Sequence, residues 1–538
     1  MININNQTIS KVFKKASQLW PEAPFFISPQ NQNRSKIEIS YRDAHELSNQ
    51  YSEKLRQCGY GLNQRIAVLL GNSPHHYIIK LALNCIGVSC VPLNPESSPS
   101  EIAFILKHSE SVLIITDKQW SSLIDKSKAI NKIALPRVYI GEFFSTLPAS
   151  TNLPPTGKVN SSTESSLLYT SGTTGKPKGC ILSNEYELMC GESYCKIGSP
   201  VALEINNDRI YNPLPSYHVN AGILSFLAVV LTGNCLIQSE RFSMSNWWKD
   251  IADTETTIFH YLGVIIAVIL SDKTQPDFKM KNLKCGFGAG VEPALHIEFE
   301  SRFKIPLIEC WGMTEMCRVL ALNEEPRMIN TRAFGKPRND LMVKVFDKNN
   351  IEVPRGQPGE MAIRHSTTNP RKGFFSGYLR DFETTEKSWK ENWFHTGDTV
   401  IQNQNGTLFF VDRLKNIIRR AGENIAAAEI ENHLLKDPRI TNVACIAVPD
   451  SIREEEIMAC IVLSNMKLAT SKTAHAIFKA SLEEMAYFKA PGYILFLTEL
   501  PKTGTQKVLK HKIFNDNHDP RKHPNVFDFR KLKKRTNR

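Results

Sequence analysis

The chain has 538 residues, of which 41% are hydrophobic and 22% are charged, and its formal net charge is +12. This length predicts at least two domains, and this composition excludes wholesale disorder, collagen-like repeats and long coiled coils. The sequence contains no run of roughly twenty apolar residues, which a membrane-spanning helix requires, and its first residues lack the apolar core of a secretory signal. We therefore expect a cytoplasmic globular protein with no transmembrane segment.

The first part of the sequence alternates between helical and strand patterns. Residues 41–59 place Ala44, Leu47, Tyr51 and Leu55 at three- and four-residue spacing and end at a glycine, which predicts an amphipathic helix. Further helices are expected at 75–86 and 101–108, and strands at 66–70, 88–93 and 111–116. This alternation predicts an α/β fold with a parallel sheet.

A loop rich in Pro, Ser and Thr (146–165) leads into an apolar strand and then into YTSGTTGKPKG at 169–179. Glycines allow backbone amides to approach an anion, hydroxyl groups donate to phosphate oxygens, and lysines supply positive charge, so a triphosphate is the expected ligand. The loop is not a Walker A motif, because two residues separate Gly172 from Gly175 and Pro177 stands where Ser or Thr would hold magnesium. The alternative is a solvated hairpin.

Three further motifs follow in order. GFGAGV (286–291) offers bare backbone beside which a purine could lie, although a glycine-rich turn would look the same. ECWGMTEM (309–316) places Thr314 and Glu315 after an apolar strand, as a phosphate and Mg²⁺ site would. WFHTGD (393–398) ends in Asp398, which suits the two hydroxyls of a ribose.

The twelve cysteines are scattered singly and form no CxxC pair, which favours buried reduced thiols over disulfides or a zinc site. The basic excess is concentrated at the end of the chain. Residues 517–538 hold eight Lys or Arg and two Asp, a net charge of +6. Such a segment is expected to be a flexible tail, or alternatively an arm that touches an anionic membrane or RNA.

From about residue 40 to residue 513 the sequence resembles the superfamily of adenylate-forming enzymes, which includes acyl-CoA synthetases, peptide-synthetase adenylation domains and luciferases. The resemblance rests on YTSGTTGKPKG, WGMTE, HTGD, DRLKNIIRRAGENIAAAEIE (412–431) and PKTGTQK (501–507), all in the family order. It implies a large N-terminal domain of parallel-sheet αβ layers (1–412), a small mobile α+β C-terminal domain (413–516) and an additional basic tail (517–538).

The resemblance also implies roles for individual residues in binding ATP. Thr314 would touch the α-phosphate, Glu315 would hold Mg²⁺, and Lys507 would bridge the substrate carboxylate and the α-phosphate. Gln506 stands where the family usually has glycine. The remaining expected nucleotide contacts are Thr170, Ser171, Gly172, Thr173, Thr174, Gly175, Lys176 and Lys178 for the β- and γ-phosphates, Gly288, Ala289 and Gly290 for adenine, Trp311 and Gly312 beside them, and Asp398 and Arg413 for ribose.

Relatives make an acyl-adenylate first and transfer the acyl group to a thiol second. The resemblance implies that the C-terminal domain rotates about a hinge at Lys415, which withdraws Lys507 and brings Gly422 and Glu423 to the site. Gly422 would line the channel for the pantetheine arm of CoA. It is also a glycine at a turn before an expected helix at 426–435.

The acid-binding pocket is less clearly marked. His218, in the Tyr217-His218 pair, is expected to gate the acyl tunnel or orient the acid, although a buried core histidine is the alternative. The indole of Trp311 would shorten the pocket and favour a small acid. Asn220, Met316 and Cys317 are further candidates for its lining.

The stretch 448–463 and the segment before it look most like CoA ligases of the crotonobetaine/carnitine type, and no carrier domain is fused to the chain. The sequence therefore predicts a ligase that uses a carboxylic acid, ATP, Mg²⁺ and CoA, with no specific nucleic-acid partner. Two alternatives stay open, namely an enzyme that loads a carrier protein and a non-catalytic protein that binds a nucleotide or RNA.

Overall fold

The computed structural model describes residues 1–30, 35–130, 132–170, 177–273, 280–413, 416–420, 423–450, 453–502, 508–514 and 519–533. The chain divides into two compact units. The first comprises Met1–Met342, Ile363–Phe394 and Gly406–Leu408, and the second comprises Val343–Ala362, His395–Asn405 and Phe409–Arg538. The sequence predicts a boundary between residues 412 and 413, whereas the second unit also includes three segments before it, namely 343–362, 395–405 and 409–412.

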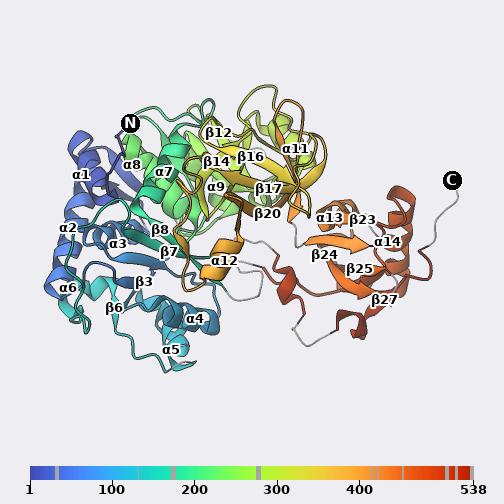
Figure 1. Cartoon of the computed structure of the whole chain (residues 1–538), viewed down its shortest axis with the longest axis horizontal. Coiled ribbons are helices and arrows are strands. Elements are labelled where there is room, and N and C mark those ends of the chain that lie inside the picture. The colour runs from blue at the N-terminus through green and yellow to red at the C-terminus, as the bar shows by residue number, and fades with distance from the viewer. Residues whose placement is uncertain are drawn as a thin grey trace. The chain divides into compact units, whose positions relative to one another are not determined.

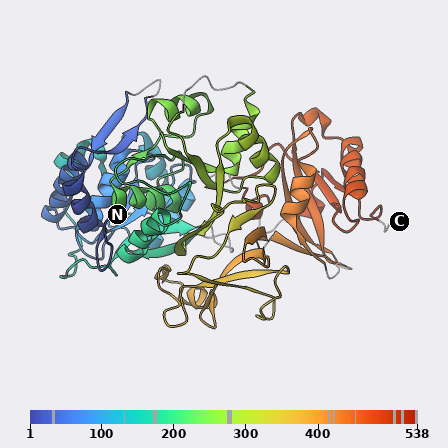
Figure 2. The same cartoon turned by 90° about the horizontal axis from the view of Figure 1, so that it is seen from above.

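The first unit contains two large sheets, and Figures 1 and 2 show their strands flanked by helices. One sheet is parallel except at its two edge strands, β2 and β14. Its strands in spatial order are β14 (Met316–Ala321), β13 (Leu307–Met313), β12 (Cys285–Ala289), β11 (Ile258–Leu262), β9 (Arg209–Tyr211), β10 (Cys235–Ile237), β1 (Pro24–Ser28) and β2 (Ile37–Ser40).

The second sheet of this unit carries the signature loop. Its strands in spatial order are β18 (Gly377–Tyr378), β8 (Lys178–Ser183), β7 (Glu164–Thr170), β4 (Ser89–Pro92), β3 (Arg65–Leu69), β5 (Leu113–Thr116) and β6 (Arg137–Tyr139). The strands from β7 to β6 are parallel, whereas β8 and β18 pair antiparallel at the edge. The predicted α/β fold with parallel sheets is confirmed.

The expected helices of this part form close to their predicted bounds. The helix α2 (Tyr41–Gln57) begins where the Ser40 hydroxyl accepts a hydrogen bond from the Asp43 amide. It buries Ala44, Tyr51 and Leu55 as the spacing predicted, whereas Leu47 is only half-buried. The other two are α3 (Pro74–Cys85) and α4 (Pro99–Ser109), the latter with a capping box between Ser98 and Glu101. Further helices of this unit are α1 (Ile9–Leu19), α5 (Ser121–Ile130), α6 (Phe143–Thr146), α7 (Asn184–Cys195), α8 (Phe226–Thr232), α9 (Trp247–Asp253), α10 (Gly263–Ser271), α11 (Pro293–Phe303) and α12 (Phe382–Lys387).

The second unit has a C-terminal sheet with helices on one face. Its strands in order are β23 (Glu423–Ala426), β22 (Ile417–Arg420), β25 (Glu454–Leu463), β26 (Tyr493–Phe496) and β27 (Val526–Asp528), and β24 (Ile440–Asp450) also pairs with β25. The helices α13 (Ala427–Leu434) and α14 (Ser471–Glu484) share one hydrophobic core with this sheet. The opposite face of the same strands forms a second core, which contains Met458, Cys460 and Leu495, and Val508 and Phe514 pack against it.

The remaining strands of the second unit form another sheet, in the order β21 (Leu408–Arg413), β20 (Trp393–Gln402), β17 (Pro358–Arg364) and β16 (Met342–Phe346). The end of the chain differs from the flexible tail expected from the sequence. Its described part, 519–533, contributes β27, which pairs antiparallel with β26. Across the ranges that the structure describes, no helix is long and apolar enough to cross a membrane.

Candidate active site

The two ends of the signature loop are held opposite each other by a β-hairpin. The strands β7 and β8 pair so that Thr170 faces Lys178 and Tyr169 faces Gly179. The Tyr169 hydroxyl lies 2.8 Å from Nδ1 of His108, which ties the hairpin to α4. The hairpin therefore fixes the positions from which the expected phosphate contacts Thr170 and Lys178 extend. Several of the expected site residues lie outside the described residues, namely Ser171, Gly172, Thr173, Thr174, Gly175, Lys176, Lys415, Gly422 and Lys507.

Thr314 and Glu315 occupy the tight connection between β13 and β14, where Met313 pairs with Met316. Both side chains are buried. The Tyr186 hydroxyl donates to the Thr314 carbonyl oxygen at 2.7 Å, and the Phe375 amide donates to the Glu315 carbonyl oxygen at 2.9 Å. These bonds fix the backbone of a turn that presents one hydroxyl and one carboxylate, as the sequence predicted.

Tyr378 links this turn to the signature hairpin. It lies on β18, which pairs with β8, and its hydroxyl donates to Oε1 of Glu315 at 2.7 Å. Nζ of Lys178 lies 5.0 Å from the centre of the Tyr378 ring, within the range of a cation–π contact. Burial and the neighbouring Glu315 carboxylate hold the pKa of Tyr378 well above its usual value, so the phenol stays a hydrogen-bond donor. Sequence reasoning missed this residue, because only the pairing of β18 with β8 brings it to the site.

The glycine-rich end of β12 is open on one side and tightly packed on the other. A Cβ on Gly288 would lie 2.2 Å from the Tyr261 carbonyl oxygen, so no other residue fits there. Gly290 has a φ of +79° and open space where its Cβ would be. The adenine contact expected at Gly288, Ala289 and Gly290 stays a prediction, and the open side of Gly290 is where a ligand could approach this segment.

Glu309 on β13 is hydrogen-bonded to this segment. Its carboxylate accepts hydrogen bonds from the Gly290 amide at 2.8 Å and from the Tyr261 hydroxyl at 2.7 Å. Burial raises the pKa of Glu309 to about 7, despite these hydrogen bonds. The sequence showed Glu309 only as the first residue of a motif, and its contact with Gly290 comes from the pairing of β12 with β13.

Trp311 and Gly312 continue β13 toward Thr314. The indole of Trp311 is buried, and its ring centre lies 6.0 Å from that of Phe334. Gly312 is exposed on the same strand. The structure therefore places both residues on β13, between Glu309 and the turn with Glu315.

A small cavity lies beside Tyr217 and His218, the pair expected at the acyl pocket. Other residues that line it include His76, Lys80, Ser216 and Gly222. Asn220, Met316 and Cys317, which the sequence also suggested, are not among its lining residues. His218 itself is exposed rather than buried, which disfavours the alternative that it is a core histidine.

A buried ion pair lies at the wall of this cavity. Nζ of Lys80 is 2.8 Å from Oε2 of Glu187 and also donates to the Ser166 hydroxyl at 2.8 Å. The side chain of Lys80 is 3% exposed and that of Glu187 is 0% exposed. Each charge therefore needs the other to offset the cost of its burial. Burial, together with the charge of Lys80, lowers the pKa of His76 to about 3 and keeps its ring neutral.

The expected ribose-binding residues belong to the second unit. Nε of Arg413 lies 3.2 Å from Oδ1 of Asp398, and Asp398 is buried. The turn before Asp398 is held by Glu360, which accepts from the Gly397 amide at 3.1 Å and lies 2.8 Å from Nδ1 of His395. The pair Asp398 and Arg413 is thus brought together by β20 and β21. Glu423 begins β23, where its backbone pairs with Arg420.

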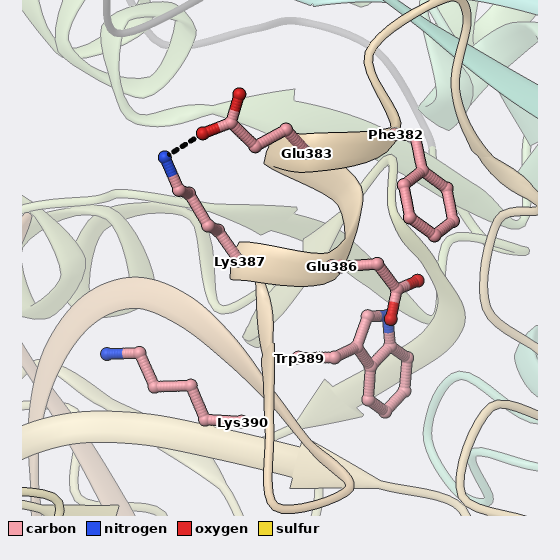
Figure 3. A pocket seen from close by; sticks show the side chains of 6 residues that line it. All are labelled: Phe382, Glu383, Glu386, Lys387, Trp389 and Lys390. Carbon is pink, nitrogen blue, oxygen red and sulfur yellow. Dashed lines mark hydrogen bonds and ion pairs between the residues drawn. The ribbon is translucent and has the colours of Figure 1, made fainter.

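The hollow along α12 is separate from these residues. It is lined by Phe382, Glu383, Glu386, Lys387, Trp389 and Lys390, and none of the predicted site residues borders it (Figure 3). Figure 3 shows Lys387 paired with Glu383 across the exposed side of this helix. The candidate site lies instead at Thr170, Lys178, Thr314, Glu315 and Gly288–Gly290, because Tyr378 contacts both Lys178 and Glu315.

Comparison with family models identifies the class of protein. Residues 13–379 match the model of AMP-binding enzymes, and residues 429–507 match that of the AMP-binding enzyme C-terminal domain. The chain belongs to the family of AMP-binding, adenylate-forming enzymes.

Relatives of known activity match along nearly the whole chain. A crotonobetaine/carnitine–CoA ligase of Proteus mirabilis is 27% identical over 525 residues, which cover 94% of this chain and 99% of the relative. A sulfoacetate–CoA ligase of Cupriavidus necator is 27% identical over 520 residues, covering 94% and 97%. The o-succinylbenzoate CoA synthetase of Bacillus subtilis, solved with its acyl-adenylate, superposes with a TM-score of 0.81 at 23% identity, covering 95% of this chain and 98% of that one.

Proposed function

We propose that this protein is an AMP-forming ligase that joins a carboxylic acid to CoA. In the first step a carboxylate oxygen attacks the α-phosphorus of ATP, the bond to the bridging oxygen breaks, and pyrophosphate leaves. In the second step the sulfur of CoA attacks the acyl carbon, the bond to the phosphate oxygen breaks, and AMP leaves while the thiol proton passes to solvent. ATP and CoA are substrates in this scheme.

The observation that carries the proposal is the contact of Tyr378 with both phosphate-binding motifs. Lys178 ends the signature loop, Glu315 follows the expected α-phosphate contact Thr314, and Tyr378 touches both. Attack of one anion on another is accelerated mainly by positioning and by positive charge, which this arrangement offers. Lys507 is proposed to supply the further positive charge at the carboxylate.

Glu315 fits the donor set expected for Mg²⁺. This ion usually takes one or two carboxylates and completes its octahedron with water and substrate phosphates. A single carboxylate that shares the ion with the phosphates of ATP is therefore the arrangement that we propose for Glu315. When bound, Mg²⁺ neutralises phosphate charge, while Tyr378 orients the Glu315 carboxylate.

CoA is proposed as the acceptor because relatives that match more than nine-tenths of the chain are CoA ligases of different acids. A few pocket residues suffice to change the acid that such a site accepts, so the proposal concerns only the size of the acid. We propose a small acid, because the cavity at Tyr217 and His218 is small and one of its lining residues, Lys80, is held by a buried ion pair with Glu187.

The test is ATP–pyrophosphate exchange across a panel of carboxylic acids that differ in length and charge, followed by measurement of CoA thioester. Exchange with at least one acid, and thioester with the same acid, are expected. Exchange without thioester would favour a carrier protein as acceptor. Nucleotide binding without exchange for any acid would overturn the proposal in favour of a non-catalytic protein.

A further inference from the structure

The interior of the first unit contains an ion pair that the phosphate-binding side chains do not use. Lys80 lies on α3 and Glu187 lies on α7, and Nζ of Lys80 is 2.8 Å from Oε2 of Glu187. A serine hydroxyl bonds each partner. Ser166 accepts from Lys80 at 2.8 Å, and Ser165 donates to Oε1 of Glu187 at 2.8 Å. Apolar side chains of similar volume often match the stability of such a pair, so stability alone does not account for it.

Lys80 also lines the small cavity beside Tyr217 and His218. The volume of this cavity is about 10 Å³, which is about the space that one small polar group needs. No carboxylate belongs to its lining among the residues that the structure describes. The ammonium group of a lysine has three N–H donors, and Ser166 and Glu187 take at most two of them. A donor therefore remains for an acceptor that enters the cavity.

The cavity and the ion pair are connected to the candidate site by neighbouring residues. Leu168 lines the cavity, and Thr170 follows two residues later at the end of the same strand, β7. Tyr186 precedes Glu187 on α7, and its hydroxyl donates to the Thr314 carbonyl oxygen at 2.7 Å. The helix α7 therefore contacts both the ion pair and the turn that presents Thr314, and the cavity belongs to the same end of the sheet as the signature loop.

The charge balance of the pair decides which chemical group the cavity accepts. Glu187 already balances Lys80, so a second anion in the cavity would be buried without a counter-charge. An alkyl group would leave the remaining N–H donor of Lys80 without an acceptor, which is also costly. A neutral oxygen avoids both costs, because it accepts a hydrogen bond and adds no charge.

We propose that the pair of Lys80 and Glu187 determines the specificity for the acid, and that this acid carries a neutral oxygen group, such as a hydroxyl, at the end opposite its reacting carboxylate. Lys80 donates to this oxygen, and Glu187 balances the charge of Lys80. The inference rests on the proposed function and extends it from the size of the acid to its chemical class.

The test is ATP–pyrophosphate exchange by the full-length protein with three matched series of acids. The first series contains ω-hydroxy acids of three to six carbon atoms. The second contains their isosteres with a methyl group in place of the hydroxyl, and the third contains dicarboxylic acids of the same lengths. At the best length, we expect kcat/KM for the hydroxy acid to exceed that for the methyl isostere about tenfold or more, and also to exceed that for the dicarboxylate.

Two variants change this preference in different directions. Lys80→Met combined with Glu187→Leu replaces the pair by apolar side chains without leaving a charge unpaired, and it should favour the methyl isostere. Glu187→Gln leaves Lys80 unbalanced and should favour the dicarboxylate, whose second carboxylate supplies the missing charge. The matched control is Lys249→Met combined with Asp253→Leu, an ion pair of the same unit with both side chains more than half exposed, and it should keep the preference of the unmodified protein.

A preference of the unmodified protein for the methyl isostere or the dicarboxylate would overturn the inference, and so would an unchanged order of preference in the apolar double variant. If that variant does not fold, the three series in the unmodified protein and the shift in Glu187→Gln still decide. Exchange with other acids but with no ω-hydroxy acid would overturn the inference alone. Failure of the proposed function is a separate result, since it appears as absence of exchange with any acid.

Discussion

The hydroxyl of Tyr378 donates a hydrogen bond to Oε1 of Glu315 at 2.7 Å, although the two residues are 63 positions apart in the chain. This bond orients the one carboxylate expected to hold Mg²⁺. Tyr378→Phe should therefore lower adenylation about tenfold, or about 1.4 kcal/mol, and raise the Mg²⁺ concentration needed for half-maximal exchange.

The measurement is pyrophosphate exchange as a function of MgCl₂. Tyr139→Phe is the matched control, because it removes a phenol hydroxyl bound to Ser121 in the same unit. An unchanged Mg²⁺ dependence in Tyr378→Phe would show that Glu315 is oriented without this bond.

The ion pair between Lys80 and Glu187 should contribute strongly to the stability of the first unit. Lys80→Met leaves the Glu187 carboxylate buried without its partner and should cost about 3–5 kcal/mol in the free energy of unfolding. All seven tryptophans lie in the first unit, so their fluorescence in a denaturant titration reports this change.

Lys249→Met is the control for this variant. Lys249 pairs with Asp253 in the same unit, but both side chains are more than half exposed. Exposed pairs contribute about 0–1 kcal/mol, so the control should differ little from the unmodified protein. A similar small effect for Lys80→Met would contradict the assignment of a structural ion pair.

Glu309 should make the stability of the first unit depend on pH. Its pKa is raised from 4.5 to about 7 in the folded state, so its contribution is fully present below about pH 4.5 and is lost as pH rises through 7. Relative to Glu309→Gln, the unmodified protein should lose about 3 kcal/mol of unfolding free energy between these values. Tryptophan fluorescence in denaturant titrations from pH 4.5 to 7.5 checks this.

Glu300 provides a comparison of opposite sign. Burial would raise its pKa, but hydrogen bonds from His296, Arg327 and the Leu307 amide lower it to about 2. The Glu300 carboxylate therefore adds to the free energy of unfolding above about pH 4.5, and this contribution is lost as pH falls through 2. Glu300→Gln should lower the free energy of unfolding near neutral pH and have little effect in acid. A parallel pH dependence of the two variants would refute these assignments.

The two half-reactions should depend on different residues of the C-terminal part. Lys507→Ala should abolish adenylation and still convert supplied acyl-adenylate with CoA, because its charge is needed only for the first step. A bulky residue at Gly422, such as Gly422→Trp, should do the reverse by blocking the thiol channel. Pyrophosphate exchange and thioester formation measure the two steps, and equal loss of both in Lys507→Ala would refute the domain-rotation account.

The sequence by itself determined the fold class, the order of the motifs and the ends of the signature loop. Periodicity and caps predicted α2, α3 and α4 because these signals are local, and strand pairing then placed Thr170 opposite Lys178. The sequence also placed Thr314 and Glu315 together after an apolar strand, and the structure shows that they lie in the turn between β13 and β14.

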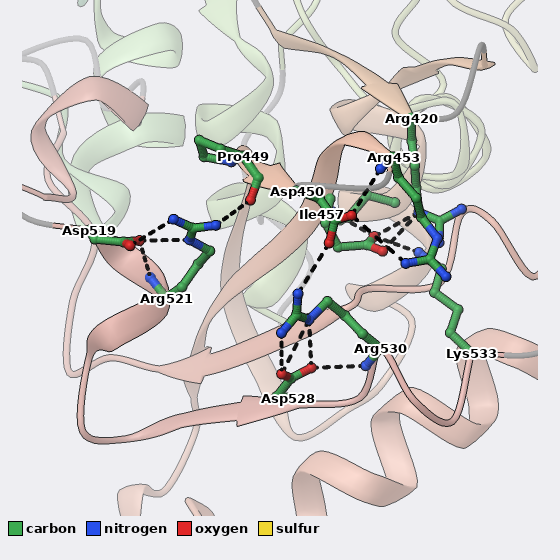
Figure 4. A network of polar contacts seen from close by, with 11 residues as sticks. Arg420, Pro449, Asp450, Arg453, Ile457, Asp519, Arg521, Asp528, Arg530 and Lys533 are labelled. Atoms are coloured by element: carbon green, nitrogen blue, oxygen red, sulfur yellow. Dashed lines mark hydrogen bonds and ion pairs between the residues drawn. The ribbon is translucent and has the colours of Figure 1, made fainter.

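Only the tertiary structure decided which distant side chains support these residues. Tyr378 reaches Glu315 through the pairing of β18 with β8. The Glu309 carboxylate accepts a hydrogen bond from the Gly290 amide because β12 and β13 are adjacent. Lys533 reaches Glu456 because β27 pairs with β26 (Figure 4). Composition alone had assigned the segment that contains β27 and Lys533 to a flexible tail. These contacts join residues far apart in sequence, and no local pattern encodes them.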